Sequence, residues 1–318
     1  GRTAARWTGR KFERAAREPR RAQLAWLDRL LKERKDTAFG RDHNFSAIDS
    51  PEGYRANVPV RDYEGFRPYI DRMVRGEKHV LTREAPFMFT TTSGTTDRPK
   101  LVPVTDSWRN ELRDLVRVWL YRTMKDHPGL MRDGMVSLVS PAVEGYTDQG
   151  VPIGSVSGLT YKKVPWYIQS TYVVPYSVMT IEDYDLRYFL ATRFALSRRA
   201  SICVAPNPST FLRMAELGNR QSETFIRAIH DGKLGIEDMA ALSAHDREVC
   251  TQLQKAQKAN PAWAKGLEQA RAKEGVLRPK DIWPNLKLIG CWLGGSCGVQ
   301  ANRLIDWYGD VAFRDPGF

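Results

Sequence analysis

Short apolar runs alternate with segments of helical spacing through this chain, and that alternation restricts the fold more than any other feature. Strands are expected at four of these runs, at 135–140, 201–205, 286–293 and 311–313. Helices are expected beside them, at 182–196, 208–217, 222–231, 299–308 and over most of 238–271, with an interruption at Asn260-Pro261. This order favours an α/β fold with a mostly parallel sheet flanked by helices. Ligands of such folds bind beyond the carboxyl ends of the strands.

A strand–loop–strand segment at 87–104 contains the clearest candidate ligand site. The apolar run Phe87–Phe89 begins one strand, and the run 101–104 forms the next. Gly94, in the loop between them, allows the backbone to turn and to approach an anion closely. Backbone N–H groups and hydroxyls of such a turn bind anions, and Lys100 adds a positive charge. The candidate phosphate-binding residues are Thr92, Ser93, Gly94, Thr95, Thr96 and Lys100.

The composition of this loop has two other interpretations. In one, it is a plain Ser/Thr turn of a hairpin, whose hydroxyls bond their own backbone. In the other, it is the phosphate loop of a nucleoside triphosphatase, G-x-x-x-x-G-K-[ST]. That pattern is not met, because no second glycine precedes Lys100 and neither Ser nor Thr follows it. The order of hydroxyls, glycine, hydroxyls and Pro-Lys instead resembles the phosphate-binding loop of the adenylate-forming superfamily, which includes acyl-CoA synthetases, luciferases and peptide-synthetase adenylation domains.

The flanks of the loop narrow this resemblance to one family. They resemble the plant auxin-responsive acyl acid–amido synthetases and their bacterial relatives over roughly residues 20–318. The matching pieces upstream are Phe39-Gly40, Val58-Pro59-Val60, Asp62-Tyr63-Glu64, Pro68-Tyr69-Ile70, Arg72 and Gly76-Glu77. Those downstream are GVPIGSVSG at 150–158, PNPSTFL at 206–212 and LGGSCGVQANRLIDWYGD at 293–310. Asp97-Arg98 departs from the family, in which a glycine is common at this point, and Asp97 points either toward the phosphates or outward.

The resemblance implies a fold, a reaction and a second part of the site. The fold would be the large N-terminal domain of the luciferase-like architecture. ATP and Mg²⁺ would activate a carboxylic acid as an acyl-adenylate, and an amine such as an amino acid would then take the acyl group. Gly294, Gly295 and Ser296 would line the nucleobase, although a Gly-Gly turn is more often purely structural. No covalent protein nucleophile is required, so no catalytic residue is assigned. The helix 108–124 and the segment 151–159 are candidate walls of an acyl pocket, with Trp119 and Tyr121 more typical of a core.

The resemblance also implies what the chain lacks. In the family, a Ser-Glu pair whose glutamate contacts the metal follows the region that ends here, and a small mobile domain follows that pair. We therefore expect the large N-terminal portion alone, with no metal ligand in it and no complete activity. Two alternatives stay open. One is another adenylate-forming ligase of the acyl-CoA type, which would form a thioester instead of an amide. The other is a non-catalytic fragment that binds a nucleotide or an acyl group.

The N-terminal region carries most of the positive charge. Residues 1–41 hold 13 Lys/Arg and 5 Asp/Glu, so net +8 of the formal +12 lies there. Two helices are expected, with Pro19 at the break between them. Their apolar face would comprise Leu24, Leu27, Leu30 and Leu31. A surface for nucleic acid or anionic membranes is one interpretation. We favour a basic helical segment, 1–36, packed on a domain formed by 37–318, with neither nucleic acid nor membrane as a partner.

The composition excludes several other classes of protein. Hydrophobic residues make up 42% of the chain and charged residues 27%, which is typical of a globular protein. No apolar run approaches the length of a membrane span. The five histidines and four cysteines show no zinc-like spacing, so no metal site is expected. Free thiols in a reducing cytoplasm are the favoured interpretation of the cysteines, which are Cys203, Cys250, Cys291 and Cys297.

Overall fold

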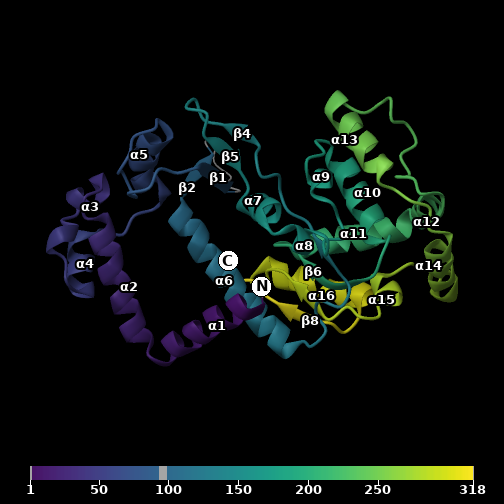
Figure 1. Ribbon diagram of the computed structural model, residues 1–318, viewed down its shortest axis with the longest axis horizontal. Helices are drawn as coiled ribbons and strands as arrows, with labels where there is room; N and C mark the ends of the chain where they lie inside the picture. The colour runs from purple at the N-terminus through teal and green to yellow at the C-terminus, as the bar shows by residue number, and fades with distance from the viewer. Residues whose placement is uncertain (1, 93–98, 318) are drawn as a thin grey trace. The chain divides into compact units, whose positions relative to one another are not determined.

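The computed structural model describes residues 2–92 and 99–317 and divides the chain into two compact units (Figure 1). Unit 1 comprises Gly1–Arg122 and Pro141–Leu159, and unit 2 comprises Thr123–Ser140 and Thr160–Phe318. The sequence predicts a different boundary, between a basic helical segment at 1–36 and a domain at 37–318, and this boundary stays a prediction.

Unit 1 combines a bundle of N-terminal helices with a small mixed sheet. In the sheet, β1 pairs antiparallel with β2 and parallel with β5, and β4 pairs antiparallel with β5, in the order β2-β1-β5-β4. The helices α6 and α7 begin in this unit and continue past its boundaries. The elements are α1 (Arg2–Arg17), α2 (Pro19–Arg34), α3 (Ala38–Asp42), η1 (Phe45–Ala47), α4 (Pro51–Asn57), α5 (Tyr63–Val74), β1 (Met88–Thr92), β2 (Lys100–Val104), α6 (Asp106–Asp126), β4 (Gly145–Tyr146), β5 (Pro152–Gly154) and α7 (Val156–Lys163).

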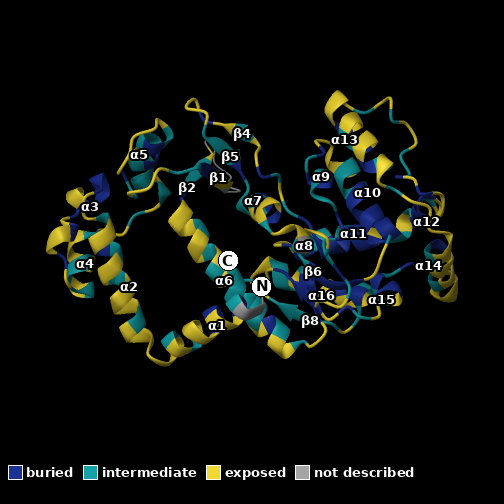
Figure 2. Ribbon diagram, in the orientation of Figure 1, coloured by how far each residue is buried: buried dark blue, intermediate teal, exposed yellow. Residues whose placement is uncertain are grey.

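Unit 2 is built on a parallel sheet with the strand order β3-β6-β7-β8. The inner strands β6 and β7 are almost wholly buried, as expected for a parallel sheet covered by helices. Figure 2 shows buried residues concentrated along α10 and α11. The elements are β3 (Gly134–Ser137), α8 (Trp166–Gln169), α9 (Tyr176–Met179), α10 (Tyr184–Ala195), β6 (Ala200–Val204), α11 (Pro208–Arg220), α12 (Ser222–Asp231), α13 (Ala244–Lys255), α14 (Pro261–Glu274), α15 (Pro279–Ile282), β7 (Leu288–Gly290), α16 (Ser296–Tyr308) and β8 (Ala312–Arg314).

The predicted α/β class and the predicted alternation are confirmed. All four expected strands of unit 2 form. Four of the five expected helices begin and end close to their expected bounds, whereas the stretch 238–271 begins only at Ala244 and is divided into α13 and α14. Pro19 occupies the first turn of α2, where its missing N–H costs nothing. Thr105 caps α6, since its hydroxyl accepts from the N–H of Trp108 at 3.3 Å.

Two sequence-based expectations are wrong. The stretch 142–175, whose many Gly, Ser and Tyr residues predict a loop-rich segment, contains β4, β5, α7 and α8. Its strands are only two and three residues long, so their pairing depends on distant partners and leaves little periodic pattern. The apolar face of α2 is also narrower than expected. Leu27, Leu30 and Leu31 pack on the cluster around Phe39 and Phe45, whereas Leu24 is exposed.

Candidate functional site

The predicted phosphate loop joins two paired strands of unit 1. The last residue pair of the hairpin is Thr92 with Lys100, so the loop begins where β1 ends and finishes where β2 begins. Ser93, Gly94, Thr95 and Thr96 lie outside the described residues, as does Asp97. The structure therefore describes the two strands that flank the loop. Their pairing confirms the predicted strand–loop–strand arrangement.

Lys100 lies against an aromatic ring from helix α5. Its ammonium nitrogen is 5.7 Å from the centre of the Tyr63 ring, within the range of a cation–π contact. The Tyr63 hydroxyl donates to the Leu101 carbonyl at 2.9 Å and accepts from the Leu101 N–H at 2.7 Å. Because β2 is an edge strand, these bonds also cover backbone groups that would otherwise be unpaired there. Burial raises the pKa of Tyr63, so this phenol stays neutral at ordinary pH.

The segment that follows β5 lies at the same end of the strands as the predicted loop. Since β5 runs parallel to β1, with Thr90 opposite Gly154, the carboxyl ends of both strands point the same way. Gly154 is required there, because a Cβ would lie 2.3 Å from the Ala142 carbonyl oxygen. The Ser155 hydroxyl follows directly, accepts from the Gly158 N–H at 3.2 Å and lies 2.6 Å from the Ser157 hydroxyl. Two hydroxyls are thus placed at the edge from which the predicted loop emerges.

The predicted nucleobase turn connects β7 to α16 in unit 2. Gly295 has φ 55° and ψ −134°, a conformation that favours glycine, and it precedes the first residue of α16. Apart from its chain neighbours, no described residue has an atom within 4 Å of the place where a Cβ would stand on Gly294 or on Gly295. A Cβ on Gly298, in contrast, would lie 2.7 Å from the Leu293 carbonyl oxygen. The turn is therefore open at its first two glycines and tightly packed at the third.

Neighbouring strand ends hold this turn in place. The Trp292 N–H donates to the Pro206 carbonyl at 2.8 Å, just beyond the end of β6. The Leu293 N–H donates to a carboxylate oxygen of Asp315 at 2.8 Å, just beyond the end of β8. The turn thus lies at the carboxyl ends of three adjacent parallel strands, the expected place for a ligand in this class of fold.

Sequence reasoning did not single out three of these supporting residues. Tyr63 and Ser155 lie in the segments 62–64 and 150–158, which carry the family resemblance. That resemblance marked both segments but assigned no function to either residue. Asp315 offered no such signal. The two predicted walls of an acyl pocket are both described, 108–124 within α6 and 151–159 in β5 and the start of α7, and their role stays a prediction. Tyr121, which is half-buried, packs against Gly9 of α1.

The described residues were also compared with what metal sites and disulfides require. Among the described residues, no group of three or more His, Cys, Asp or Glu side chains could hold a metal ion. All four cysteines are free, and Cys203, Cys250 and Cys291 are buried. Residues 2–92 and 99–317 also contain no helix that is both long and apolar enough to cross a membrane.

The two predicted turns thus lie at strand ends of an α/β protein, one in each unit, and comparison with known proteins identifies the family. A model of the GH3 family N-terminal domain matches residues 8–313. The chain belongs to this family. The resemblance to the auxin-responsive amido synthetases is confirmed by this match.

Plant enzymes are among the curated relatives of this chain. The chain is 24% identical to the indole-3-acetic acid-amido synthetase GH3.15 of Arabidopsis thaliana, over 89% of this chain and 48% of that protein. It is 26% identical to the probable indole-3-acetic acid-amido synthetase GH3.11 of Oryza sativa subsp. japonica, over 81% of this chain and 44% of that protein. The chain spans about half the length of these relatives.

A solved structure shares the fold. The GH3.15 acyl acid amido synthetase matches with a TM-score of 0.73 at 21% identity, over 91% of this chain and 50% of that one. A second structure of that protein, in complex with 2,4-DB, matches with a TM-score of 0.74. The similarity confirms the predicted fold, that of the large N-terminal region of an amido synthetase.

Proposed function

We propose that this chain is the nucleotide- and acyl-binding portion of an ATP-dependent acyl acid–amido synthetase. The observation that carries the proposal is membership of the GH3 family over residues 8–313, with both predicted nucleotide turns inside the matched region. The relatives' names give amide synthesis as their activity.

The proposed reaction has two steps. A carboxylate attacks the α-phosphate of ATP, which gives an acyl-adenylate and pyrophosphate. An amine, such as that of an amino acid, then attacks the acyl carbon and releases AMP. Negative charge shifts toward pyrophosphate in the first step, so donors and cations around the phosphates favour it.

Each of the two predicted turns suits one part of ATP, as the family resemblance implies. The ammonium of Lys100, placed at the end of the loop, would attract the phosphates while Tyr63 limits its movement. The hydroxyls of Thr92, Ser93, Thr95 and Thr96 would add donors, as the family resemblance implies. The open backbone at Gly294 and Gly295 leaves room for a flat ring to approach. Mg²⁺ would neutralise phosphate charge when bound. No described acidic cluster fits it, so we assign it no residue.

Product analysis tests the proposal. The protein would be incubated with ATP, a panel of aryl and indolyl carboxylic acids, and either amino acids or coenzyme A. We expect ATP-dependent amide formation with at least one acid. Thioester formation would instead indicate an acyl-CoA ligase, and an absence of both products in the longest natural form of the protein would contradict enzymatic function. The four free thiols support a further proposal, a reducing cytoplasmic location.

A further inference from the structure

Unit 1 contains a contact between a buried histidine and an arginine, outside both predicted turns. His43 directly follows α3 and is buried, and Arg61 lies just before α5. The Nη2 nitrogen of Arg61 lies 2.6 Å from Nε2 of His43. On the other side of the same ring, Nδ1 lies 2.9 Å from the Phe39 carbonyl oxygen. Both ring nitrogens of His43 are therefore engaged.

These two contacts define the protonation state of the ring. A carbonyl oxygen can only accept, so Nδ1 carries the hydrogen and donates to Phe39. A guanidinium can only donate, so Nε2 carries no hydrogen and accepts from Arg61. The His43 ring is thus neutral in this arrangement. A proton added at Nε2 would remove the acceptor and bring two cations into contact.

The other charged and titratable side chains around this contact are engaged with partners. The Tyr69 hydroxyl of α5 donates to a carboxylate oxygen of Asp42 at 2.8 Å, and Arg72 of the same helix binds Glu77 through two hydrogen bonds. Burial raises the pKa of Tyr69, so this phenol stays neutral at ordinary pH. The helices α2 and η1 contribute apolar side chains to the same cluster, namely Leu30, Leu31 and Phe45.

Arg61 also lies against the start of α5. Its guanidinium carbon is 5.3 Å from the centre of the Phe39 ring and 5.5 Å from that of the Phe66 ring, both within the range of cation–π contacts. A Cβ on Gly65 would lie 2.8 Å from the Cβ of Arg61, so the first turn of α5 is packed directly on this side chain. The position of Arg61 therefore determines where α5 begins.

The first residue of α5 connects this contact to the predicted phosphate loop. That residue is Tyr63, whose ring lies beside Lys100 and whose hydroxyl bonds both backbone groups of Leu101. Only one residue separates Arg61 from Tyr63, so a displacement of Arg61 would shift the Tyr63 ring against which Lys100 lies.

We propose that Arg61 is a positioning residue for ATP binding, held in place by the neutral ring of His43. Protonation of His43 releases Arg61, loosens the start of α5 and displaces Lys100 from the phosphates, so ATP binds more weakly in acid. Histidine suits this regulation because its charge changes between about pH 5 and pH 8. The inference rests on the proposed function, since it describes how the proposed ATP site responds to pH.

Calorimetric titration with ATP at several pH values, on the longest natural form of the protein, tests the proposal. Between about pH 7.5 and pH 5.5, the parent should lose about fivefold or more in affinity relative to His43→Gln. The glutamine side-chain carbonyl can still accept from Arg61 but does not titrate. Protonation of ATP itself affects both proteins equally. Parallel pH profiles in the parent and His43→Gln overturn the proposal.

Arg61→Gln tests the same contact from its other side. This variant should bind ATP about fivefold or more weakly than the parent at about pH 7.5. Its pH profile should follow that of His43→Gln, because His43 then has no guanidinium to release. Parent-like affinity in Arg61→Gln, with circular dichroism unchanged, overturns the proposal.

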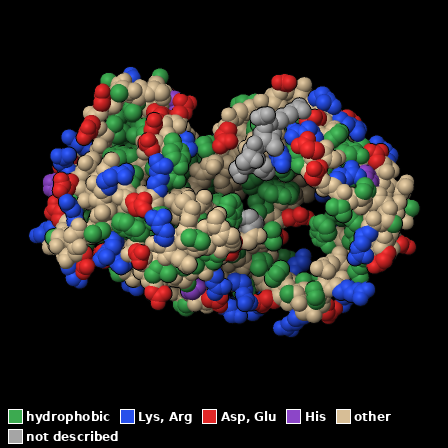
Figure 3. Space-filling view, turned by 180° about the vertical axis from the view of Figure 1, so that it is seen from behind, with side chains coloured by type: hydrophobic (Ala, Val, Ile, Leu, Met, Phe, Trp, Pro, Cys, Tyr) green, Lys and Arg blue, Asp and Glu red, His purple; other side chains and the backbone are tan. Residues whose placement is uncertain are grey.

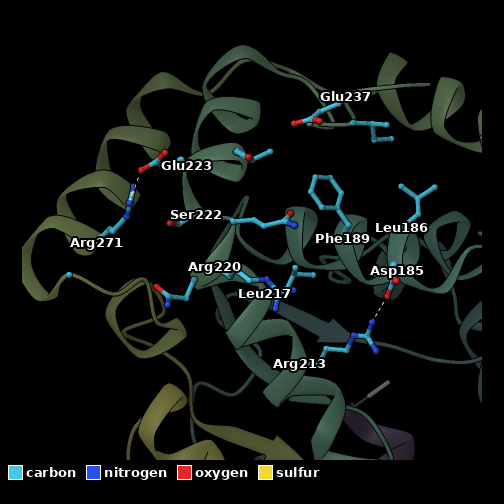
Figure 4. A pocket seen from close by; sticks show the side chains of 16 residues that line it. Asp185, Leu186, Phe189, Arg213, Leu217, Arg220, Ser222, Glu223, Glu237 and Arg271 are labelled. Atoms are coloured by element: carbon cyan, nitrogen blue, oxygen red, sulfur yellow. Dashed lines mark hydrogen bonds and ion pairs between the residues drawn. The ribbon is translucent and has the colours of Figure 1, made fainter. Parts of the chain in front are cut away.

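Arg213 of α11 provides a matched control. Its guanidinium also lies on two aromatic rings, 4.5 Å from the centroids of both Tyr184 and Tyr188. Figure 4 shows it paired with Asp185 at the wall of a cavity in unit 2, outside both predicted turns. Arg213→Gln should therefore keep the ATP affinity and the pH profile of the parent. A profile like that of Arg61→Gln would contradict a specific role for Arg61.

Nitrogen-15 NMR of the histidine rings provides a measurement that needs neither ATP nor a stable Arg61 variant. At about pH 7.5, the signals that are lost in His43→Gln should belong to a neutral ring with its hydrogen on Nδ1. A charged ring, or one with its hydrogen on Nε2, overturns the proposal. ATP binding with parallel pH profiles overturns this inference alone, whereas no ATP binding at any pH overturns the proposed function as well.

Discussion

At the residue scale, Lys100 and Tyr63 are the best-described side chains of the candidate nucleotide site. We expect Lys100→Ala to weaken ATP binding about tenfold or more, because a charged contact to phosphate is lost. Circular dichroism should be unchanged. Lys78→Ala is the matched control, since Lys78 is an exposed lysine of the same unit. Equal ATP affinities for the two variants, measured by calorimetry, would contradict the role of Lys100.

Tyr63 makes two different contacts, and two variants distinguish them. Its hydroxyl bonds to strand β2, and its ring lies beside Lys100. Tyr63→Phe removes the hydroxyl that bonds both backbone groups of Leu101, so the free energy of unfolding should fall by about 0.5–1.5 kcal/mol for each hydrogen bond lost. The ring beside Lys100 remains, so ATP affinity should change little. Tyr63→Ala should lower both quantities. Urea unfolding and calorimetry on the two variants check this, and a large loss of ATP affinity in Tyr63→Phe would contradict it.

Single residues also mark the limit of sequence reasoning. The hydroxyl-Gly-hydroxyl-Pro-Lys string pointed to Lys100, because its composition suits phosphate. The string contained nothing that pairs Lys100 with Tyr63, which is far away in sequence and meets it only through packing of α5 on β2. Asp315 likewise acts through a distant backbone N–H, that of Leu293, and such a bond leaves no local pattern.

At the element scale, the segment from β7 into the first turn of α16 contains glycines that differ in the space around them. Gly294 has room for a Cβ, whereas Gly298 does not. Gly294→Ala meets open space, so stability should stay within about 0.5 kcal/mol of the parent. If the turn contacts the nucleobase, that variant should bind ATP about fivefold or more weakly, since overpacking costs about 1 kcal/mol or more. Gly298→Ala meets the Leu293 carbonyl and should lower stability by about 1–3 kcal/mol. Full ATP affinity in Gly294→Ala would argue that the turn is purely structural.

Elements with a strong repeating pattern could be predicted, and those without one could not. The apolar run 286–293 and the helical spacing after it predicted β7 and α16. The strands β4 and β5 were missed in a stretch expected to be loop. A three-residue strand such as β5 is defined by its register with β1, including Thr90 opposite Gly154, and by the close approach of Ala142. Neither feature is periodic in sequence.

At the scale of the whole molecule, the surface is strongly charged and the buried thiols couple stability to pH. Figure 3 shows many Lys and Arg side chains spread over one face. Within the core, burial raises the pKa of Cys250 and of Cys291 from 9.0 to about 11. The folded protein therefore retains protons that the unfolded chain releases above pH 9.

This coupling predicts alkaline destabilisation of unit 2. As pH rises from 9 to 11, stability should fall, by up to about 1.4 kcal/mol per pH unit for each such thiol. Below pH 8 these groups should make no pH-dependent contribution. Cys291→Ala should flatten the decline, whatever its cost at neutral pH. Urea-unfolding midpoints at pH 7, 8, 9 and 10, in the presence of reductant, measure the effect. Parallel curves for parent and variant would contradict it.

The central claim is that this chain takes part in ATP-dependent activation of a carboxylic acid. Acid-dependent exchange of labelled pyrophosphate into ATP, measured on the longest natural form of the protein, tests it most directly. We predict exchange with at least one aryl or indolyl acid, none without acid, and a loss of about tenfold or more in Lys100→Ala at subsaturating ATP but not in Lys78→Ala. No exchange with any acid, or equal exchange in both variants, would contradict the account.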